Sequence, residues 1–309
     1  MIAGSGSSLR LLQIEFPALK FFEIASYGIS YPSRGPLLVH LFLKIPSLLS
    51  VIKKEHSEIA DIVQNESIDF IISDNRYGCY HERVPSAIVI HQLSIRASAF
   101  TRIVNHHNRN FIKHFNACWV PDTPDHKLSG KLSVNNSIKH RFIGPLSRMK
   151  SVETKEHFHL LGLVSGPEPH RTTFDTILTH QLKESGLSYR LVRGLPLLEA
   201  ADGPVFTHLP SNQLNELIGG AEVVVCRSGY STIMDLAALG KKAIFVPTPG
   251  QTEQLYLAKE MERQKIAPYV LQGDLDLPKA LERMKDFTGF TEDHFKNNLL
   301  QSTLSEFLD

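Results

Sequence analysis

Cysteine is scarce in this sequence, and its spacing excludes two classes of protein. The 309 residues contain only Cys79, Cys118 and Cys226, with no Cys-x-x-Cys pair among them. Structural zinc sites and disulfide frameworks both need regularly spaced cysteines, usually in even number. The sequence therefore predicts neither kind of site, and it favours a reducing, cytoplasmic compartment.

An excess of charge and a long apolar run are also lacking. With 33 basic and 32 acidic residues, the formal net charge is +1. Proteins that bind nucleic acid through phosphate contacts need a net basic face, so no nucleic-acid partner is expected.

The most apolar stretch is too short to cross a membrane. It covers residues 36–46, far fewer than the roughly 20 apolar residues that span a bilayer. We expect no signal peptide, because no basic region, apolar core and cleavage site open the sequence. The stretch is expected to form a buried or interfacial helix. Because Lys44, Lys53 and Lys54 lie nearby, peripheral contact with a membrane surface is the alternative.

Length and composition indicate two globular domains. At roughly 100–200 residues per domain, 309 residues suggest two, and 42% hydrophobic with 21% charged residues is ordinary for a folded protein. Apolar strand-like runs alternate with helical stretches, which is typical of parallel sheets covered on both faces. We predict an α/β fold of two Rossmann-like, doubly wound domains, residues 1–146 and 147–309. They are expected to face a cleft at the carboxyl ends of their strands.

The expected elements follow from this alternation. In the first domain they are strands at 68–74, 87–92, 117–122 and 141–146 and a helix over 97–115. In the second they are strands at 159–166, 188–194, 205–207, 221–226 and 242–247, with helices over 174–185, 213–218, 231–239, 253–264 and 291–308.

The most informative segment follows an apolar run in the second domain. Arg227-Ser228-Gly229 ends that run, and a helix is expected to begin at once. Free N–H groups and the dipole at a helix start favour an anion such as a diphosphate, and Gly229 has no Cβ to obstruct it. Thr232 adds a hydroxyl. Asp235 lies one turn deeper, where its carboxylate can accept hydrogen bonds from both ribose hydroxyls. The structural alternative is a helix cap with a solvated Asp235.

A second polar cluster follows the next expected strand. Gln251, Glu253 and Gln254 come directly after a Pro-Thr-Pro-Gly turn. Their side chains are donors and acceptors of the kind that bind sugar hydroxyls. The structural alternative is a capping box with Thr252 as the helix cap, and the two interpretations are compatible.

These two segments together resemble the donor-nucleotide signature of the GT-B glycosyltransferases. The signature runs over residues 227–258 and has a fixed order. After a strand come Arg-Ser-Gly, a Thr, an acidic residue and a Gly, and after the next strand come Pro-x-Pro and a glutamine-containing stretch. The sequence is most similar to the MurG-like N-acetylglucosaminyltransferases of peptidoglycan synthesis, which carry the family 28 C-terminal domain.

The resemblance implies roles for individual residues. Asp235 takes the place of the family's ribose-binding glutamate, and Glu253 and Gln254 take the place of its two sugar-binding glutamines. Ser228 and Gly229 would face the diphosphate. Asp235 keeps the carboxylate, whereas Glu253 departs from glutamine and leaves the donor sugar open. The expected donor site also includes Arg227, Thr232 and Gln251.

Two further loops fit the same layout. Gly166 follows the first strand of the second domain, where the family has a Gly-rich turn. Prolines replace the other glycines here, so Arg171 is expected to supply positive charge to the diphosphate, with a solvated helix-start role as the alternative. Leu209 lies in the family's base-binding loop and is the expected packing residue for uracil, or simply a loop residue.

Polar residues end two strands of the first domain, on the acceptor side. Asp74 can orient or deprotonate an acceptor hydroxyl, Arg76 can hold an acceptor phosphate, and His91 is a second reachable base. A structural role in a turn is the alternative for each. The histidines form no metal-binding pattern such as HExxH, and the resembled family needs no metal. No metal or cofactor is therefore expected, and the helix start with Arg171 would stabilise the leaving group.

The first residues resemble the end of a strand that runs into a turn. Members of the resembled family have a strand, a histidine-containing Gly-rich loop and a helix before a strand like Ile2-Ala3-Gly4. We therefore expect an N-terminally shortened first domain. It would lack the expected general base, part of the acceptor site and a central strand, which exposes strand edges.

The leading hypothesis is a hexosyltransferase that works with inversion and without a metal. It would move a sugar, expected to be N-acetylglucosamine, from a UDP-sugar to an acceptor. The apolar residues 37–49 suggest a lipid-linked acceptor and a cell-envelope role at the inner face of the membrane. One alternative is a UDP-sugar hydrolase or epimerase of the same fold. Another is a donor-binding subunit or inactive remnant that needs a second chain.

Overall fold

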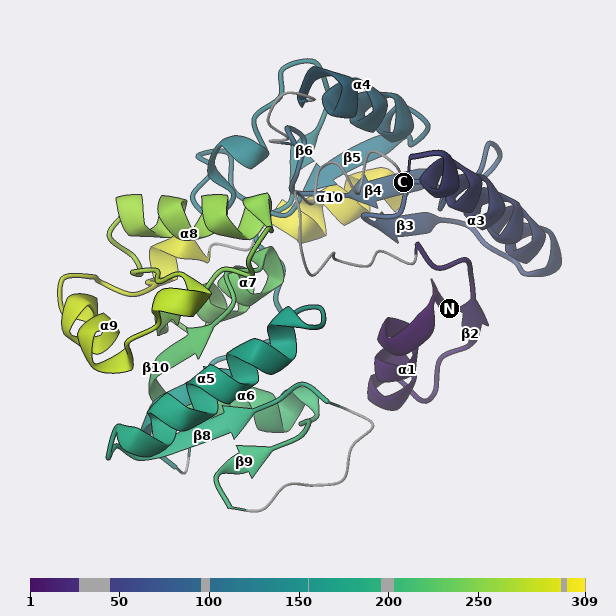
Figure 1. The fold of residues 1–309 in the computed structure, drawn as a ribbon. Coiled ribbons are helices and arrows are strands. Elements are labelled where there is room, and N and C mark those ends of the chain that lie inside the picture. Colours follow the sequence, from purple (N-terminus) through teal and green to yellow (C-terminus); the bar gives the residue numbers. More distant parts are fainter. Residues whose placement is uncertain (28–44, 96–100, 155, 196–202, 296–298, 309) are drawn as a thin grey trace. The chain divides into compact units, whose positions relative to one another are not determined.

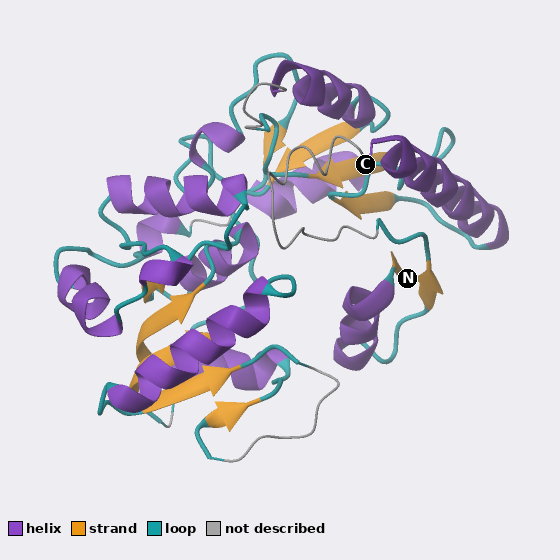
Figure 2. Cartoon of the chain, in the orientation of Figure 1, coloured by secondary structure: helices purple, strands orange, loops and turns teal. Residues whose placement is uncertain are grey.

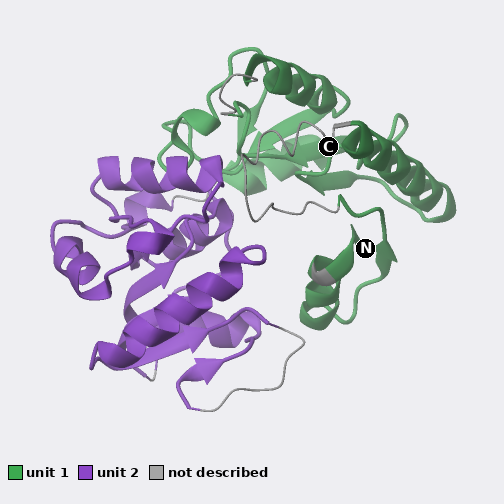
Figure 3. Cartoon of the chain, viewed as in Figure 1, with its two compact units in different colours: residues 1–144, 298–309 green, residues 145–297 purple. Residues whose placement is uncertain are grey.

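Two compact units make up the protein. The computed structural model describes residues 1–27, 45–95, 101–154, 156–195, 203–295 and 299–308, and Figure 1 labels their elements. Unit 1 comprises residues 1–144 and 298–309, and unit 2 comprises residues 145–297 (Figure 3). Both combine parallel strands with helices (Figure 2). The C-terminal residues 298–309 thus group with unit 1, which differs from the expected second domain of 147–309.

Unit 2 is built on a five-stranded parallel sheet of order β11-β10-β7-β8-β9. Its strands are β7 (Phe158–Leu163), β8 (Tyr189–Val192), β9 (Val205–Phe206), β10 (Ala221–Cys226) and β11 (Lys242–Phe245). The chain runs outward from β7 through β8 to β9 and then returns to place β10 on the other side of β7. Ligands of open α/β sheets bind at the carboxyl ends of the strands where the order reverses, here between β7 and β10.

Five α-helices accompany these strands in the described residues of unit 2. They are α5 (His170–Glu184), α6 (Ser211–Gly220), α7 (Tyr230–Ala238), α8 (Thr252–Arg263) and α9 (Leu277–Met284). The residues at the start of α9 show why that helix begins where it does. Asp276 caps the helix by accepting a hydrogen bond from the Lys279 N–H at 3.1 Å, and Pro278 lies in the first turn. Leu277 and Met284 are buried on its inner face.

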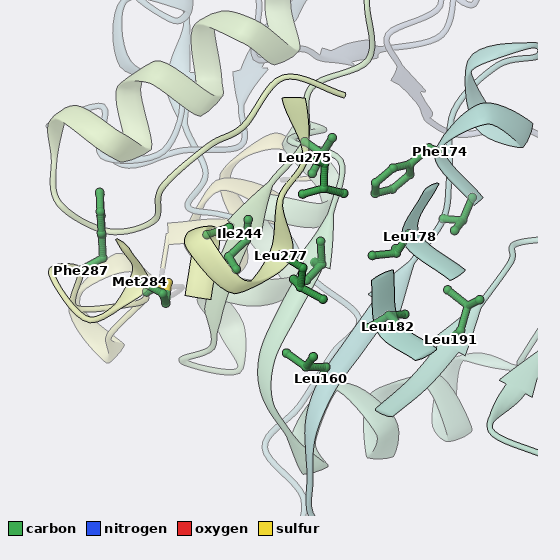
Figure 4. Close-up of a cluster of buried hydrophobic side chains, with 14 residues drawn as sticks. Leu160, Phe174, Leu178, Leu182, Leu191, Ile244, Leu275, Leu277, Met284 and Phe287 are labelled. Carbon is green, nitrogen blue, oxygen red and sulfur yellow. The ribbon is translucent and has the colours of Figure 1, made fainter. Parts of the chain in front are cut away.

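The core of unit 2 lies between α5 and the sheet. Phe174, Leu178 and Leu182 are fully buried at the four-residue spacing of a core-facing helix. They share one apolar cluster with Leu191 of β8 (Figure 4). A Cβ on Gly162 would lie 2.7 Å from Leu191 and 2.9 Å from Leu178, so glycine lets α5 approach β7.

The described residues of unit 1 form two separate parallel sheets. The larger has the order β3-β4-β5-β6, from β3 (Ile71–Asp74), β4 (Ser86–Val89), β5 (Ala117–Val120) and β6 (Arg141–Phe142). The smaller pairs β1 (Ile2–Gly4) with β2 (Phe21–Glu23). The α-helices among its described residues are α1 (Gly6–Glu15), α3 (Ile45–Asn65), α4 (Thr101–Ile112) and α10 (Leu299–Leu308). None of the described helices is long and apolar enough to cross a membrane.

Several expected helices differ from the observed ones. The helix expected at 291–308 is a short 3-10 turn, Glu292–His294, followed by α10, which starts at Leu299. The helix expected over 97–115 is α4, of which residues 97–100 lie outside the described residues. Most of the apolar stretch at 36–46 also lies outside them, and only its last two residues begin α3.

A buried carboxylate fastens the β1–β2 segment to the rest of unit 1. Glu55 of α3 is fully buried and accepts hydrogen bonds from Tyr27 Oη at 2.6 Å and Arg76 Nε at 2.5 Å. Arg76 also donates to the Ala25 carbonyl, just after β2. Burial lowers the pKa of Arg76, but the charge and hydrogen bond of Glu55 outweigh it and raise that pKa overall. The ion pair therefore acts as a tether between distant segments.

We expect Glu55→Gln to lower the free energy of unfolding by about 2 kcal/mol. The amide keeps the shape of the side chain but loses its charge-assisted hydrogen bonds with Arg76 and the Gly78 N–H. Urea denaturation measures the loss. Glu58→Gln is the matched control, because Glu58 also accepts from this segment, at the Ala25 N–H, but is partly exposed. Equal losses for the two variants would contradict the tether.

Candidate functional site

Three loops meet at the carboxyl ends of β7, β10 and β11 in unit 2. They precede α5, α7 and α8 respectively. Arg227, only 1% exposed, joins them through its guanidinium. Nη1 donates to the carbonyls of Val246 at 2.9 Å and Pro247 at 3.2 Å, and Nη2 donates to the carbonyl of His170 at 2.9 Å. One side chain thus fixes the shape of the whole edge.

Two further contacts hold Arg227 itself. Nη2 donates to Gln272 Oε1 at 2.6 Å, and the guanidinium lies over the ring of Phe174, 4.2 Å from its centroid. Burial lowers the pKa of Arg227 to about 10, with a smaller opposing effect from Cys226. The sequence predicts Arg227 among the donor-binding residues. In the structure its two Nη atoms hold the loops, and a donor-binding role for its Nε stays a prediction.

Two buried polar atoms beside Gly166 have no hydrogen-bond partner among the described residues. They are Arg227 Nε and Thr248 Oγ1. Gly166 has a positive φ of 105°, and a Cβ there would lie 3.4 Å from Thr248 Oγ1 and 4.0 Å from Arg227 Nε. Buried polar atoms are normally hydrogen-bonded, so unpaired ones beside a bare glycine suit an incoming anionic oxygen.

The residues before α7 divide into a buried anchor and a more open helix start. Ser228 is buried, and its Oγ donates to the Gln254 carbonyl at 2.8 Å. Gln254 Oε1 in turn accepts from the Thr248 N–H at 2.8 Å, which ties this loop to the start of α8. Gly229 is the N-cap residue of α7, and no side chain caps the helix within the described residues. Thr232 lies in its first turn, partly buried.

Asp235 lies one turn deeper on α7 and is held in place. Its Oδ1 accepts a hydrogen bond from Ser147 Oγ at 2.6 Å. Burial raises the pKa of Asp235, an effect that the Ser147 hydrogen bond and the charge of Arg148 oppose. The carboxylate is therefore oriented by a residue far away in the sequence.

We expect Asp235→Asn to raise the free energy of unfolding near neutral pH. A raised pKa means that folding disfavours the charged carboxylate, and Asn can still accept from Ser147. Above the unfolded pKa of about 3.9 the folded wild type holds protons that the unfolded chain has lost, so its stability falls as pH rises through the raised pKa.

Denaturation at pH 3 and pH 7 checks this expectation. The advantage of Asp235→Asn should be present at pH 7 and shrink at pH 3, where both states of the wild type are protonated. A variant less stable than the wild type at pH 7 would show that the carboxylate is not strained by burial.

The start of α8 differs from the capping alternative. The helix begins at Thr252 with Gln251 as its N-cap residue, and no side chain caps it within the described residues. The capping box with Thr252 as cap is therefore wrong. Gln251 and Glu253 are partly buried, next to Gln254. Their role as sugar ligands stays a prediction.

The structure gives Arg171 and Leu209 surroundings that favour their predicted donor-binding roles less than those of Gly166 and Asp235. Arg171 is 14% exposed and pairs with Glu168, Nη2 to Oε1 at 2.5 Å, so its charge is shared. Its buried Nη1 has no partner among the described residues. Leu209 lines a separate cavity of about 300 Å³ together with Phe206 and Leu217. The roles of both residues stay predictions.

In unit 1, two of the predicted acceptor-side residues come together. Asp74 ends β3 and pairs in register with Val89 of β4, two residues before His91. Desolvation by the surrounding protein raises the pKa of Asp74, although its side chain reaches solvent, and the charge of His91 opposes this. Arg76 is instead held by Glu55 and the Ala25 carbonyl, which gives it a structural role.

Comparison with known proteins finds a family similarity that covers part of the site. Residues 205–302 match the model of the glycosyltransferase family 28 C-terminal domain. This stretch is similar to a family 28 C-terminal domain. A UDP-N-acetylglucosamine–N-acetylmuramyl-(pentapeptide) pyrophosphoryl-undecaprenol N-acetylglucosamine transferase of Haemophilus influenzae is 36% identical over 94 residues, 30% of this chain and 25% of the relative. The enzyme of the same name from Methylorubrum extorquens is 45% identical over 64 residues, 21% of this chain and 15% of the relative. The match therefore spans a quarter or less of either relative.

Solved structures match over nearly the whole chain. MurG of Acinetobacter baumannii has a TM-score of 0.55 at 13% identity and covers 99% of this chain and 97% of that one. The glycosyltransferase VinC, solved with dTDP, has a TM-score of 0.60 at 11% identity and covers 99% and 90%. These likenesses show the GT-B fold and confirm the predicted fold class. With the family 28 domain, they also confirm the resemblance to MurG-like enzymes.

Proposed function

We propose that this protein is a glycosyltransferase that uses a UDP-sugar donor. The observation that carries the proposal is the convergence of three loops at the switch point of the sheet that bears the family 28 domain. The start of α7, which no described side chain caps, and the polar atoms beside Gly166 would bind the diphosphate oxygens. Asp235, one turn deeper on α7, would accept hydrogen bonds from the two ribose hydroxyls.

The reaction would be a displacement at the anomeric carbon of the donor. The acceptor oxygen forms a bond to that carbon while the bond to the UDP oxygen breaks, and attack from the opposite side inverts the configuration. The electron pair leaves on UDP, where the positive end of α7 stabilises it without a metal. The acceptor proton passes to Asp74 or His91, and the raised pKa of Asp74 makes its carboxylate a stronger base.

The donor sugar is proposed to be N-acetylglucosamine. Gln251, Glu253 and Gln254 would bind its hydroxyl and acetamido groups beyond the diphosphate. The relatives in Haemophilus influenzae and Methylorubrum extorquens carry a prenyl pyrophosphoryl acceptor in their names, which supports a lipid-linked acceptor. This would place the protein in cell-envelope synthesis, at the cytoplasmic face of the membrane.

Release of UDP from UDP-N-acetylglucosamine, with and without a lipid-linked muramyl acceptor, tests the proposal. We expect release that depends on the acceptor and falls when UDP-glucose replaces the donor. Release at the same rate without acceptor would favour the hydrolase alternative. Binding of UDP without turnover would favour a donor-binding subunit.

A further inference from the structure

The loop after β5 contains a chain of buried hydrogen bonds. It starts at Asp122, two residues beyond the strand, which is fully buried. Asp122 Oδ2 accepts from Ser129 Oγ at 2.5 Å, and Ser129 Oγ lies 2.5 Å from Ser133 Oγ. The last contact joins Ser133 Oγ to His126 Nδ1 at 2.7 Å. Both serines are fully buried, so the chain runs from a buried carboxylate to a partly exposed histidine.

The direction of each of these hydrogen bonds follows from the protons available. A carboxylate can only accept, and Asp122 Oδ2 also takes the Ser129 N–H at 2.7 Å. The single hydroxyl proton of Ser129 therefore goes to Asp122, and Ser133 must donate to Ser129. The Gly130 carbonyl, 3.4 Å from Ser133 Oγ, is a poorer acceptor for that proton. Because Ser133 has no second proton, its oxygen accepts from His126, and Nδ1 of that ring carries a proton.

This proton on Nδ1 fixes the chemistry of the other ring nitrogen of His126. A neutral imidazole has one N–H, so Nε2 has a free lone pair. Within the described residues Nε2 has no hydrogen-bond partner. The ring of Phe142 packs edge-on against the imidazole, with the centroids 5.1 Å apart. Nε2 is therefore a fixed hydrogen-bond acceptor, which suits an O–H or N–H group and repels a phosphate oxygen.

His126 lies at the edge of the sheet where an acceptor is expected. Its loop follows the carboxyl end of β5 and is fastened to the segment after β4, because the Ser94 N–H donates to the Leu132 carbonyl at 2.9 Å. That segment begins next to His91, the predicted acceptor-side base. Ligands of open α/β sheets bind at the carboxyl ends of the strands. His126 and His91 therefore belong to the same edge of unit 1.

We propose that His126 Nε2 accepts a hydrogen bond from a hydroxyl or amide N–H group of the acceptor. The position would select a neutral hydrogen-bond donor of a sugar or peptide and reject a phosphate oxygen, which can only accept. The inference rests on the proposed function, since it assigns a binding residue to the acceptor of that reaction. It leaves the proton transfer to Asp74 or His91.

Nuclear magnetic resonance of the full chain with isotope-labelled histidine tests the tautomer. At mildly alkaline pH, where histidine is neutral, we expect the proton of His126 on Nδ1 and none on Nε2. The signal is assigned by its loss in His126→Asn. Ser133→Ala removes the acceptor of the Nδ1 proton and should move that proton toward Nε2. A wild-type ring with its proton on Nε2 would overturn the proposal.

Titration of the same sample with a soluble N-acetylmuramyl peptide tests the ligand. The Nε2 signal of His126 should shift with this probe and not with inorganic pyrophosphate. His140 is the matched control, because its Nδ1 donates to the Ile138 carbonyl at 2.7 Å and gives it the same tautomer. It precedes β6, at the opposite end of the strands, and its signal should not move. Equal shifts at both histidines, or a shift with pyrophosphate alone, would contradict the assignment.

His126→Asn gives the functional readout. Asparagine tolerates the positive φ of 56° at this position, and its amide can still donate to Ser133, so the fold is kept while Nε2 is lost. The KM for the lipid-linked muramyl acceptor should rise roughly five- to tenfold, the worth of one hydrogen bond, with UDP affinity unchanged. His140→Asn should change neither. An unchanged KM in His126→Asn would sink the inference. A muramyl shift at His126 without any transfer would support it and contradict the proposed function.

Discussion

Asp235→Ala should weaken UDP binding roughly 10- to 100-fold. A carboxylate that accepts a hydrogen bond from ribose contributes about 1.5–3 kcal/mol, and each 1.4 kcal/mol is tenfold in affinity. Because Ser147 already orients the carboxylate, the side chain of Asp235 loses little conformational entropy when the ligand binds. Isothermal titration of the full chain with UDP measures the change.

Two variants separate ribose binding from structural damage. Asp235→Glu keeps the carboxylate and should stay within a few-fold of the wild type. Asp175→Ala removes a different partly buried aspartate of unit 2, which pairs with Arg193, and should leave UDP affinity unchanged. If Asp235→Ala binds UDP as tightly as the wild type does, Asp235 has no role in the donor site.

Arg227→Met should lower the free energy of unfolding by about 4 kcal/mol or more. Methionine fills most of the space but leaves three backbone carbonyls, of Val246, Pro247 and His170, without their donor. Each buried acceptor left unpaired costs about 1–3 kcal/mol. Urea denaturation followed by circular dichroism measures the loss.

Two control variants separate the effect of the positive charge of Arg227 from that of its guanidinium geometry. Arg227→Lys keeps a charge but not the planar fork that reaches several carbonyls, so an intermediate loss is expected. Arg263→Met removes an exposed arginine paired with Glu260 and should change stability by less than about 1 kcal/mol. A loss for Arg227→Met as small as that for Arg263→Met would contradict the role of Arg227 in joining the loops.

The sheet of unit 2 was predictable because its central strands, β7 and β10, are mostly buried. Continuous apolar runs such as Val223 to Cys226 show up in the sequence without any tertiary information. The helix α3 was not predicted, and its buried positions explain why. Its inward stripe includes Ile52, Glu55 and Ile59, and the charged residue in the middle interrupts the apolar periodicity.

The candidate site was predictable only in part. The order of residue types located Gly166, Arg227 to Gly229 and Asp235 at one edge of the sheet. It did not show which side chains face a ligand. Arg227 and Ser228 make internal hydrogen bonds that the sequence did not reveal, and their donor-binding roles stay predictions.

The residues that hold the site in place could not be predicted, because they lie far in the sequence from the residues they contact. Ser147 lies 88 residues from Asp235, and Gln272 lies 45 residues from Arg227. Only the fold reveals that the Thr248 hydroxyl has no hydrogen-bond partner among the described residues. No local pattern connects such pairs, because only the folded sheet brings them together.

Hydrogen exchange of the full chain with and without UDP tests the donor site most directly. We expect UDP to protect three places: the loop at Gly166, the first turn of α7, and the residues between β11 and α8. ADP at the same concentration should protect them less. Protection confined to other segments, or none at saturating UDP, would contradict the assignment of this edge of unit 2 as the nucleotide site.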